Sequence, residues 1–213
     1  TLLLTFQQNA IARMSCNPAI GGVAKGQLVR EIDALGGAMG RIADRAGIQF
    51  RMLNTSKGPA VWGPRAQQDM YLYEKLMQKH LAEVKNLTIM EDELLRFEKN
   101  GALFSLQLKN SSLSSSALII TSGTFLKGMM YRGEDRMEGG RVGEPAATSL
   151  SQSLADHNIV LRRLKTGTPM RIQGDSIDYE QMGVQHGDKQ PLPFSIWSDH
   201  ELNNRARCWT TRT

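Results

Sequence analysis

Residues 117–124 read Ala-Leu-Ile-Ile-Thr-Ser-Gly-Thr, and this stretch decides the fold class. Four consecutive apolar residues between polar neighbours predict a short strand that is buried on both faces, as the strands of parallel sheets are. Hydroxyl side chains and a glycine follow directly, at the strand end where doubly wound sheets bind their ligands. The stretch therefore predicts an α/β fold with a binding loop at residues 121–124.

The elements predicted on either side of this stretch belong to the same class. Apolar runs and alternation predict further strands, at residues 2–5, 48–53, 87–90 and 159–164. Apolar residues at helical spacing predict helices, at residues 28–35, 66–82 and 147–156. The pair Asn100-Gly101 predicts the turn of a hairpin over residues 93–109, and the serine-rich residues 111–116 predict a polar connector. Helices alternating with buried strands indicate a doubly wound α/β domain.

The composition and periodicity of the sequence change near residue 131. The stretch Gly139-Gly140-Arg141-Val142-Gly143 is rich in glycine, and the residues after 174 show few periodic signals. We therefore predict two domains, a first one over residues 1–135 and the start of a smaller, inserted α+β domain over residues 136–213.

The composition is that of an ordinary globular protein, with 40% hydrophobic and 22% charged residues in a chain of 213. The longest apolar runs are far shorter than the roughly 20 residues that would span a bilayer, so no membrane association is expected. We expect the cytoplasm as the compartment. The net charge of +5 suits a polyanionic partner such as RNA, although a solvated basic surface explains the same charge.

The two cysteines and the glycine-rich loops exclude several kinds of site. Cys16 and Cys208 lie far apart without Cys-x-x-Cys spacing, which predicts free thiols and no metal site. Gly21 and Gly26 have the spacing of a phosphate-binding P-loop, but Gln27 follows where that loop needs lysine. No Gly-x-Gly-x-x-Gly occurs in the chain. These general rules alone lead no further than an α/β domain.

Longer motifs carry a resemblance to a known family. They are Met14-Ser15-Cys16-Asn17-Pro18-Ala19-Ile20-Gly21-Gly22, Gly47-Ile48-Gln49-Phe50, Ser56-Lys57-Gly58-Pro59-Ala60-Val61, Gly123-Thr124-Phe125-Leu126, Gly139-Gly140-Arg141, Arg163-Leu164-Lys165-Thr166-Gly167-Thr168-Pro169 and Gln185-His186-Gly187-Asp188. In this order they resemble the glucose-inhibited division protein A family. The resemblance spans nearly the whole chain but only a minority of the family's full length.

The resemblance implies a fold and an activity. Residues 1–135 would be part of a Rossmann-like FAD-binding domain of the glutathione-reductase type, and residues 136–213 the start of an inserted NAD- or substrate-associated domain. The whole protein would be a homodimer that forms a heterotetramer with the GTPase MnmE. It would add a carboxymethylaminomethyl group to carbon 5 of the wobble uridine of certain tRNAs. The reaction would use FAD, NADH, methylenetetrahydrofolate, and glycine or ammonium.

This chemistry gives the two cysteines a possible role. Carbon 5 of uracil is a poor nucleophile until a group adds at carbon 6, and a thiolate suits that addition near neutral pH. Cys16 and Cys208 both stand where the family carries cysteine, so they are the candidate catalytic thiols, as nucleophile or as acid and base. Which of them attacks is left open, and a packed, inert thiol is the competing explanation for either.

The remaining candidates are cofactor contacts that the resemblance implies. Lys57 and Lys165 could neutralise flavin or substrate charge, with structural turns as the competing explanation. The other residues assigned to cofactors are Asn17, Gly21, Gly22, Leu94, Thr121, Ser122, Gly123, Thr124, Ala147 and Thr166, and, in the segment that resembles the start of the family's NAD-binding stretch, Asn204, Arg205, Arg207, Trp209, Thr210 and Thr211.

Two alternative functions remain at this point. The first is the related folate- and FAD-dependent tRNA uridine methyltransferase, against which the Lys57 loop and the Gly139-Gly140-Arg141 motif argue. The second is a noncatalytic nucleotide- or RNA-binding module, against which the presence of both cysteines argues.

Overall fold

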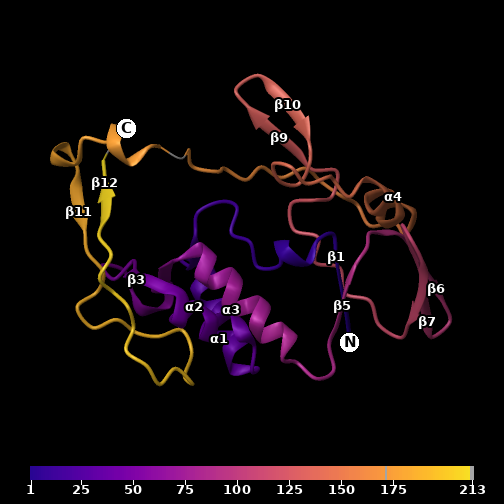
Figure 1. Cartoon of the computed structure of the whole chain (residues 1–213), viewed down its shortest axis with the longest axis horizontal. Coiled ribbons are helices and arrows are strands. Elements are labelled where there is room, and N and C mark those ends of the chain that lie inside the picture. Colours follow the sequence, from indigo (N-terminus) through magenta and orange to yellow (C-terminus); the bar gives the residue numbers. More distant parts are fainter. Residues whose placement is uncertain (171, 212–213) are drawn as a thin grey trace. The chain divides into compact units, whose positions relative to one another are not determined.

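A computed structural model describes residues 1–170 and 172–211 (Figure 1). The chain forms two compact units: unit 1 comprises Thr1–Ala10 and Asn86–Thr166, and unit 2 comprises Ile11–Lys85 and Gly167–Thr213. The predicted border at residue 135 is therefore not a border between compact units. The physical reason lies in the parallel pairing of β1 (Leu2–Thr5) with β5 (Thr88–Glu91), because parallel neighbours need a long crossover. The segment that connects β1 to β5 contains Ile11–Lys85, and these residues belong to unit 2.

Unit 1 contains antiparallel strands in addition to the parallel pair. The strands β6 (Leu94–Asn100), β7 (Leu103–Leu108) and β8 (Ser112–Ser115) form one sheet in that order. A second hairpin joins β9 (Met129–Arg132) to β10 (Asp135–Glu138), and the short helix η1 (Gln8–Ala10) follows β1. The hairpin predicted around Asn100 and Gly101 is confirmed, with Gly101 at a φ of +63°.

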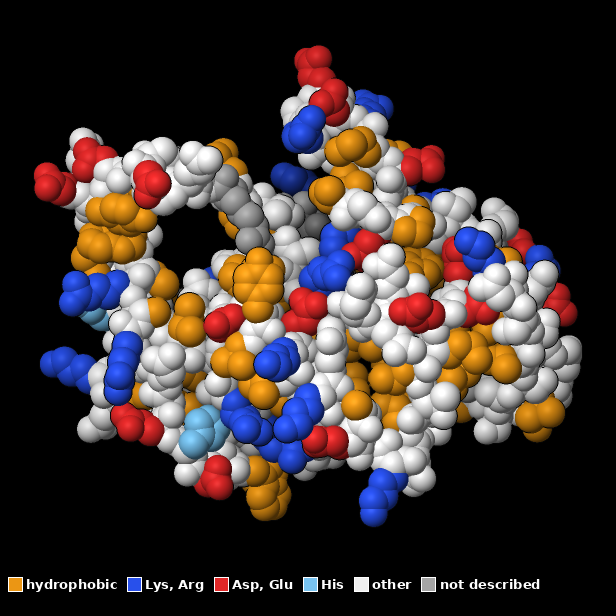
Figure 2. Space-filling model, viewed as in Figure 1, with side chains coloured by type: hydrophobic (Ala, Val, Ile, Leu, Met, Phe, Trp, Pro, Cys, Tyr) orange, Lys and Arg blue, Asp and Glu red, His pale blue; other side chains and the backbone are white. Residues whose placement is uncertain are grey.

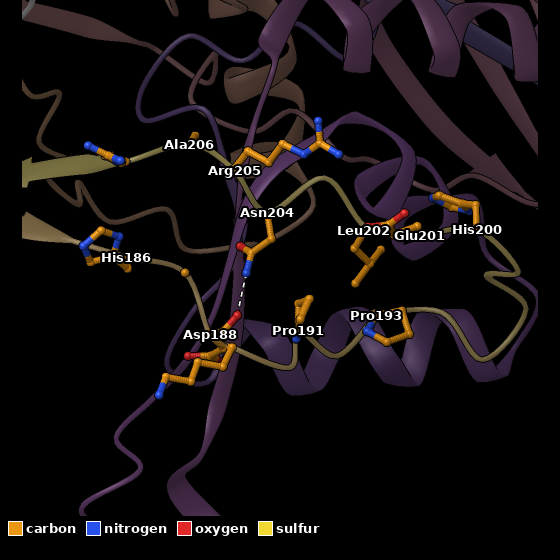
Figure 3. A pocket seen from close by; sticks show the side chains of 13 residues that line it. His186, Asp188, Pro191, Pro193, His200, Glu201, Leu202, Asn204, Arg205 and Ala206 are labelled. Atoms are coloured by element: carbon orange, nitrogen blue, oxygen red, sulfur yellow. Dashed lines mark hydrogen bonds between the residues drawn. The ribbon is translucent and has the colours of Figure 1, made fainter.

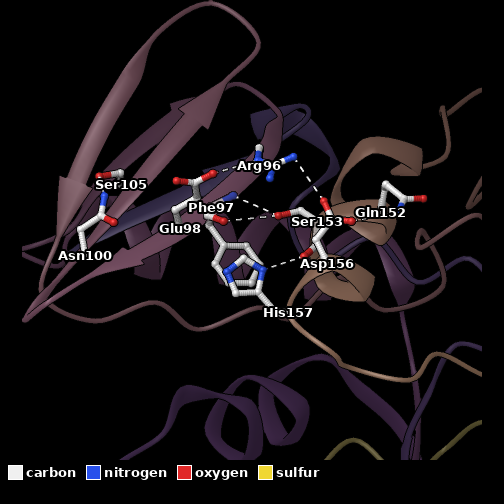
Figure 4. A network of polar contacts seen from close by, with 9 residues as sticks. All are labelled: Arg96, Phe97, Glu98, Asn100, Ser105, Gln152, Ser153, Asp156 and His157. Atoms are coloured by element: carbon white, nitrogen blue, oxygen red, sulfur yellow. Dashed lines mark hydrogen bonds and ion pairs between the residues drawn. The ribbon is translucent and has the colours of Figure 1, made fainter.

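The helix α4 (Thr148–Asp156) packs against β6 and closes the core of unit 1 (Figure 4). Phe97 on β6 is buried together with Leu150 and Leu154 of the helix. Ser153 Oγ accepts a hydrogen bond from the Phe97 amide at 3.2 Å, and the His157 ring stacks on the Phe97 ring at 4.4 Å. The predicted helix over residues 147–156 is thus confirmed and is docked by both apolar and polar contacts.

Three predictions in unit 1 are wrong. Residues 117–120 and 159–164 form no strand, and the predicted connector at 111–116 contains β8, which pairs with β7. Leu118 and Ile120 still pack against the core while Ile119 is 85% exposed, so the apolar run at 117–120 has strand-like alternation without a strand partner. A strand is defined by its ladder, and no described segment supplies one for this run.

Unit 2 is an antiparallel sheet covered by helices. The strands β2 (Ala19–Gly21), β4 (Gly63–Gln68) and β3 (Gly47–Leu53) lie in that order. The helices are α1 (Lys25–Ala34), α2 (Ala38–Ala46) and α3 (Met70–Ala82), with short 3₁₀ turns at Pro59–Val61, Gly174–Ser176 and Tyr179–Gln181. A hairpin pairs β11 (Gly183–Gln185) with β12 (Cys208–Thr210).

The core of unit 2 lies between the sheet and the helices. Its buried residues are Val29, Ile42, Ala43, Ala46, Phe50, Ala66, Tyr73 and Phe194. The predicted helix over residues 66–82 starts four residues later, at Met70, because residues 63–68 pair with β3 as β4. The predicted strand at 48–53 and the helix at 28–35 are confirmed, with α1 shifted by a few residues.

Among residues 1–170 and 172–211, no helix combines the length and the apolar character that crossing a membrane requires.

Candidate functional site

Two segments from far along the chain cover the free edge of β3. The Phe50 carbonyl accepts a hydrogen bond from the Asp188 amide at 2.8 Å, and the Asp188 carboxylate accepts one from the Met52 amide at 2.6 Å. The Phe50 amide donates to Asn204 Oδ1 at 2.6 Å, and the Ala206 amide donates to the Ile48 carbonyl at 3.1 Å. The sequence motif at residues 185–188 and the segment at 204–208 therefore take the place of a neighbouring strand.

Gln49 joins both segments to β3. Its side chain is 3% exposed, and its Nε2 donates to the carbonyls of Gln185 at 2.8 Å and Ala206 at 3.0 Å. Its Oε1 lies 3.1 Å from the Sγ of Cys208. One buried amide thus holds both strands of the β11–β12 hairpin and one of the two candidate thiols.

The next residue of β12, Trp209, alternates to the other side of the hairpin. Its ring meets the Tyr179 ring edge to face, with centroids 5.0 Å apart, and each residue is 40% exposed. Hydrophobic side chains gather over β11 and β12 in the space-filling view (Figure 2). Trp209 and Thr210, both predicted cofactor contacts, are therefore accessible.

A cavity of about 780 Å³ lies beside this hairpin, between residues 186–193 and 200–207 (Figure 3). Asn204 spans the two walls, because its Nδ2 donates to the Asp188 carbonyl at 2.6 Å. The basic side chains of the lining are His186, Lys189, His200, Arg205 and Arg207, and the acidic ones are Asp188 and Glu201. Three of these groups, Lys189, Arg205 and Arg207, are permanent cations at neutral pH, against the two carboxylates of Asp188 and Glu201.

Cys16 lies at a second place in unit 2, in the loop before β2. The residue is exposed, and its Sγ donates to the Gly167 carbonyl at 3.2 Å. The neighbouring Asn17 is also exposed, and its carbonyl accepts the Ala19 amide at 2.7 Å. The structure thereby brings together two motifs that are 151 residues apart in the sequence.

The two glycines after this loop differ in their surroundings. Gly21 has a φ of +83°, and a Cβ there would collide with the Pro64 carbonyl and the Phe194 ring. Gly22 has a φ of +103° and nothing within 4 Å of a Cβ position, so its strain-free backbone borders open space. Gly21 therefore serves packing, and the contact of Gly22 with a cofactor stays a prediction.

Lys57 has an exposed side chain on a loop whose backbone is held in place. Its amide donates to the Asn54 carbonyl at 2.9 Å, and its carbonyl accepts the Trp62 Nε1 at 3.0 Å. The loop therefore presents a cation on a fixed backbone, and the predicted role of Lys57 toward flavin or substrate stays a prediction.

Unit 1 holds the other predicted cofactor residues. Thr124 Oγ1 donates to the Gly140 carbonyl at 2.9 Å, which joins the binding loop at 121–124 to the Gly139-Gly140-Arg141 motif. Gly123 has a φ of +57° and open space at its Cβ position, and Thr121 is exposed while Ser122 is half-buried. Side-chain hydroxyls and an unobstructed backbone thus lie together on this loop.

Leu94 and Ala147 have a different place in unit 1. Both belong to its apolar core, and Ala147 is only 4% exposed. The Ala147 amide donates to the Phe125 carbonyl at 2.7 Å, and its carbonyl accepts the Ser151 hydroxyl at 2.8 Å. Packing alone accounts for these two residues, and their contact with a cofactor stays a prediction.

The predicted site residues are thus divided between the units. Unit 2 holds Cys16, Asn17, Gly21, Gly22, Lys57, Asn204, Arg205, Arg207, Cys208, Trp209, Thr210 and Thr211, and unit 1 holds Leu94, Thr121, Ser122, Gly123, Thr124, Ala147, Lys165 and Thr166. Lys165 and Thr166 are exposed and directly precede Gly167, the partner of Cys16. No group of three or more potential metal ligands occurs in the part of the chain that the structure describes.

Sequence reasoning missed Gln49 and two buried carboxylates. Asp44 accepts hydrogen bonds from the amides of Phe194 and Ser195 at 2.8 and 2.9 Å, and Asp33 accepts one from Ile196 at 3.1 Å. The carboxylates are 1% and 2% exposed, so they anchor residues 194–196 from inside the core. The only signal in the sequence is a charged residue on a helix where the apolar face should lie.

A parallel strand pair, a long crossover and glycine-rich loops with exposed hydroxyls place the chain in the class of Rossmann-like α/β proteins. The model of the family described as Glucose inhibited division protein A matches residues 1–213. The chain belongs to this family, and the resemblance seen in its motifs is confirmed.

Curated relatives are similar over the whole chain. The tRNA uridine 5-carboxymethylaminomethyl modification enzyme MnmG of Endomicrobium trichonymphae is 47% identical, and the enzyme of the same name from Thermodesulfovibrio yellowstonii is 48% identical. The chain covers 37% and 34% of these two proteins. It therefore spans about a third of the length of the curated relatives that it matches.

Solved structures agree with the sequence comparison. Two crystal forms of GidA from Aquifex aeolicus match 98% of the chain with a TM-score of 0.90 at 39% identity, over 36% of the Aquifex chain. The predicted α/β fold class is confirmed by this likeness.

Proposed function

We propose that the full-length protein is an FAD-dependent enzyme that adds a carboxymethylaminomethyl group to carbon 5 of a wobble uridine in tRNA. The observation that carries the proposal is the exposed Cys16 thiol, held between the two longest motifs of the family. The names of the similar curated proteins support the same tRNA uridine modification.

The residues present fit a flavin cofactor at the binding loop of unit 1. Gly123 leaves its Cβ position open, and the Thr124 hydroxyl is fixed by the Gly140 carbonyl. Hydroxyls and unobstructed backbone on one loop suit the polar ribityl chain and phosphates of a dinucleotide. FAD would supply the redox chemistry when bound. Residues 121–124 would orient it, and Lys165 of the same unit would balance its charge.

Cys16 is suited to the covalent part of such a reaction. The thiol is exposed on a glycine-rich loop, so a uracil ring can approach it, and its single bond to the Gly167 carbonyl is replaceable. Addition of its sulfur to carbon 6 makes carbon 5 nucleophilic, which is the activation that the modification needs. Catalytic residues are often found on loops that a rigid scaffold positions.

The co-substrates, the reductant and the protein partners belong to the same proposal. Methylenetetrahydrofolate and glycine or ammonium supply the added atoms, NADH reduces the flavin, and the cavity beside β12 with Asn204, Arg205 and Arg207 takes the reductant. A homodimer acts with the GTPase MnmE as a heterotetramer, in the cytoplasm. The lining of that cavity has more basic than acidic side chains, which supports an anionic ligand there.

The first test is the visible absorption spectrum of the full-length protein, before and after addition of NADH, with tRNA turnover assayed alongside. We expect a bound flavin that NADH bleaches, and turnover that Cys16→Ala abolishes while Ser15→Ala, a change at the exposed neighbour, preserves it. A protein that takes up no flavin even when FAD is added would contradict the enzyme and leave a nucleotide- or RNA-binding module. Methylated uridine as the product would instead identify the folate-dependent methyltransferase.

A further inference from the structure

Residues 201–209 alternate between exposed and half-buried side chains, which is the pattern of an extended chain that covers the β3 edge with one side. Asn204 and Cys208 lie on the covered side, where their side chains bond to residues of β3. Three residues that alternate with them are exposed on the opposite side: Arg205, Arg207 and Trp209. Two guanidinium groups and an indole thus follow one another along one exposed side of this segment.

The indole of Trp209 is held by its neighbours without being covered. Val184 is its partner across the β11–β12 hairpin, and the Tyr179 ring meets it at 62° with centroids 5.0 Å apart. Trp209 and Tyr179 are each 40% exposed. A large aromatic side chain that is fixed in place and stays accessible presents a surface on which another ring can stack.

Cations in line with an exposed aromatic ring are typical of sites for single-stranded nucleic acid, where the cations contact phosphates and the ring stacks on an unpaired base. Arg205 and Arg207 are about 7 Å apart along an extended chain, close to the separation of successive phosphates in a stretched single strand. The turn beyond Trp209 is acidic, at Asp178 and Glu180. The charges therefore favour phosphates at the two arginines and a base at the indole.

The position of the aromatic pair separates it from the cavity proposed for the reductant. Arg205 and Arg207 line that cavity, whereas Trp209 and Tyr179 lie outside its lining. Small-molecule sites enclose most of the ligand surface, but a ring stacked on Trp209 stays open to solvent on the outer side of the hairpin. A strand of RNA that passes over the hairpin suits this position better than an enclosed dinucleotide does.

We propose that Trp209, with Tyr179 beside it and the guanidinium groups of Arg205 and Arg207 next to it, forms a stacking site for an unpaired RNA base. In the full-length protein this base belongs to the anticodon loop of tRNA, next to the wobble uridine. The identity of the RNA rests on the proposed function, but the affinity of the site for unpaired RNA does not.

Binding of a labelled oligouridylate to the full-length protein, followed by fluorescence anisotropy, tests the site without any turnover assay. Trp209→Ala should weaken binding by roughly 5- to 100-fold, the factor that the loss of one base–aromatic stack corresponds to. Trp209→Phe should recover most of the affinity, because phenylalanine also stacks on bases. The matched control is Trp197→Ala, since Trp197 is 66% exposed in the same unit and lies outside the hairpin. An unchanged affinity in Trp209→Ala, or an equal loss in Trp197→Ala, would overturn the proposal.

A second measurement needs no substitution. An oligouridylate that carries one 2-aminopurine should lose fluorescence when the original protein binds it, because stacking quenches this base. Binding without quenching would overturn the stacking site even if Trp209→Ala failed to fold. Displacement of the oligonucleotide by NADH, together with a weaker affinity of Trp209→Ala for NADH, would assign the ring to the reductant and would equally overturn it.

The failure of this proposal and that of the proposed function are distinguishable. A protein that modifies no tRNA, but whose affinity for the oligouridylate depends on Trp209, would contradict the proposed function and retain the stacking site. A protein that modifies tRNA, but whose affinity for RNA does not change in Trp209→Ala, would contradict the stacking site alone.

Discussion

At the scale of single residues, the buried carboxylates show how polar groups specify the core of unit 2. Asp44 accepts three hydrogen bonds, from the amides of Phe194 and Ser195 and, at 2.6 Å, from the hydroxyl of Ser198. These donors would be left unpaired inside the protein without it, and each unpaired buried group costs about 1–3 kcal/mol. Asp44 therefore determines where residues 194–198 lie and holds Phe194 in the core.

Asp44→Ala should lower the free energy of unfolding by about 3–5 kcal/mol, because it removes the acceptor and leaves its donors buried. Asp44→Asn keeps one acceptor oxygen and should lose less. The measurement is urea unfolding of the full-length protein, with Asp199→Ala as the control, since the Asp199 side chain in the same segment is fully exposed. A loss below about 1 kcal/mol in Asp44→Ala would contradict this role.

Ionisation of the buried Tyr73 should lower the stability of the fold at alkaline pH. Burial raises the pKa of Tyr73 from 10.0 to about 12, because the charged phenolate loses its hydration. The folded pKa is the higher one, so the stabilising contribution is complete below pH 10 and is lost as the pH rises toward 12. The loss amounts to at most about 3 kcal/mol.

Between pH 9 and 12, the free energy of unfolding should therefore fall less steeply with rising pH in Tyr73→Phe than in the original protein. Tyr71→Phe serves as the control, since Tyr71 lies on the same helix and is 75% exposed. Equal pH dependence in the original protein and in Tyr73→Phe would show that the phenol does not contribute.

At the scale of elements, local signals such as the end of α1 and the tight turn of the β6–β7 hairpin could be read from the sequence, but the pairing of other strands could not. Gly36 and Gly37 end α1 within a few residues of the prediction, since helix termination is local chemistry. Residues 117–120 have the composition of a strand and pair with nothing described, while the serines of β8 pair with β7. Strand formation depends on partners distant in the sequence, which composition does not report.

The start of α3 gives a prediction at this scale. Asp69 caps the helix, with its Oδ1 accepting the amides of Tyr71 at 3.1 Å and Leu72 at 3.0 Å. Asp69→Ala should reduce the free energy of unfolding by about 1 kcal/mol, and Asp69→Ser should restore most of it because serine also caps helices. Thermal unfolding of the three proteins checks the order, and equal stability of the alanine and serine variants would contradict a capping role.

At the scale of the whole molecule, the net charge of +5 does not by itself locate a binding surface. On the face drawn in Figure 2, Lys and Arg side chains lie among Asp and Glu side chains rather than in one field. The cavity beside β12 is more informative, because Lys189, Arg205 and Arg207 meet there from two separate segments. The sequence shows Arg205 and Arg207 together, but their proximity to Lys189 depends on the cover of the β3 edge.

If this cavity contacts tRNA phosphates, Arg207→Ala should weaken tRNA binding and reduce the slope of log affinity against log salt concentration by about 1. Arg132→Ala is a suitable control, since this exposed arginine lies on the β9–β10 hairpin of unit 1 and pairs with Asp135 at 3.7 Å. Filter binding across a salt series gives the slopes. An unchanged slope in Arg207→Ala would exclude phosphate contact at this residue and favour a role toward the nicotinamide cofactor alone.

The sequence alone proposes candidate site residues where these residues form contiguous motifs. The loop with Cys16, Gly21 and Gly22 is one such place, and the hydroxyl loop at 121–124 is another. Gln49 stands inside a strand motif with no local sign of its three long-range bonds, which span between 136 and 159 residues. The interleaving of the two units escaped prediction for the same reason, since it follows from the pairing of β1 with β5.

The cover of the β3 edge has a consequence for biosynthesis. Gln49 and its partner Gln185 are separated by 136 residues, and ribosomes add about 5–20 residues per second. The β3 edge is therefore complete roughly seven to thirty seconds before the segments that cover it are made. During that interval the nascent chain carries a bare strand edge that another chain can pair with, and a chaperone that shields it should raise the yield of soluble protein.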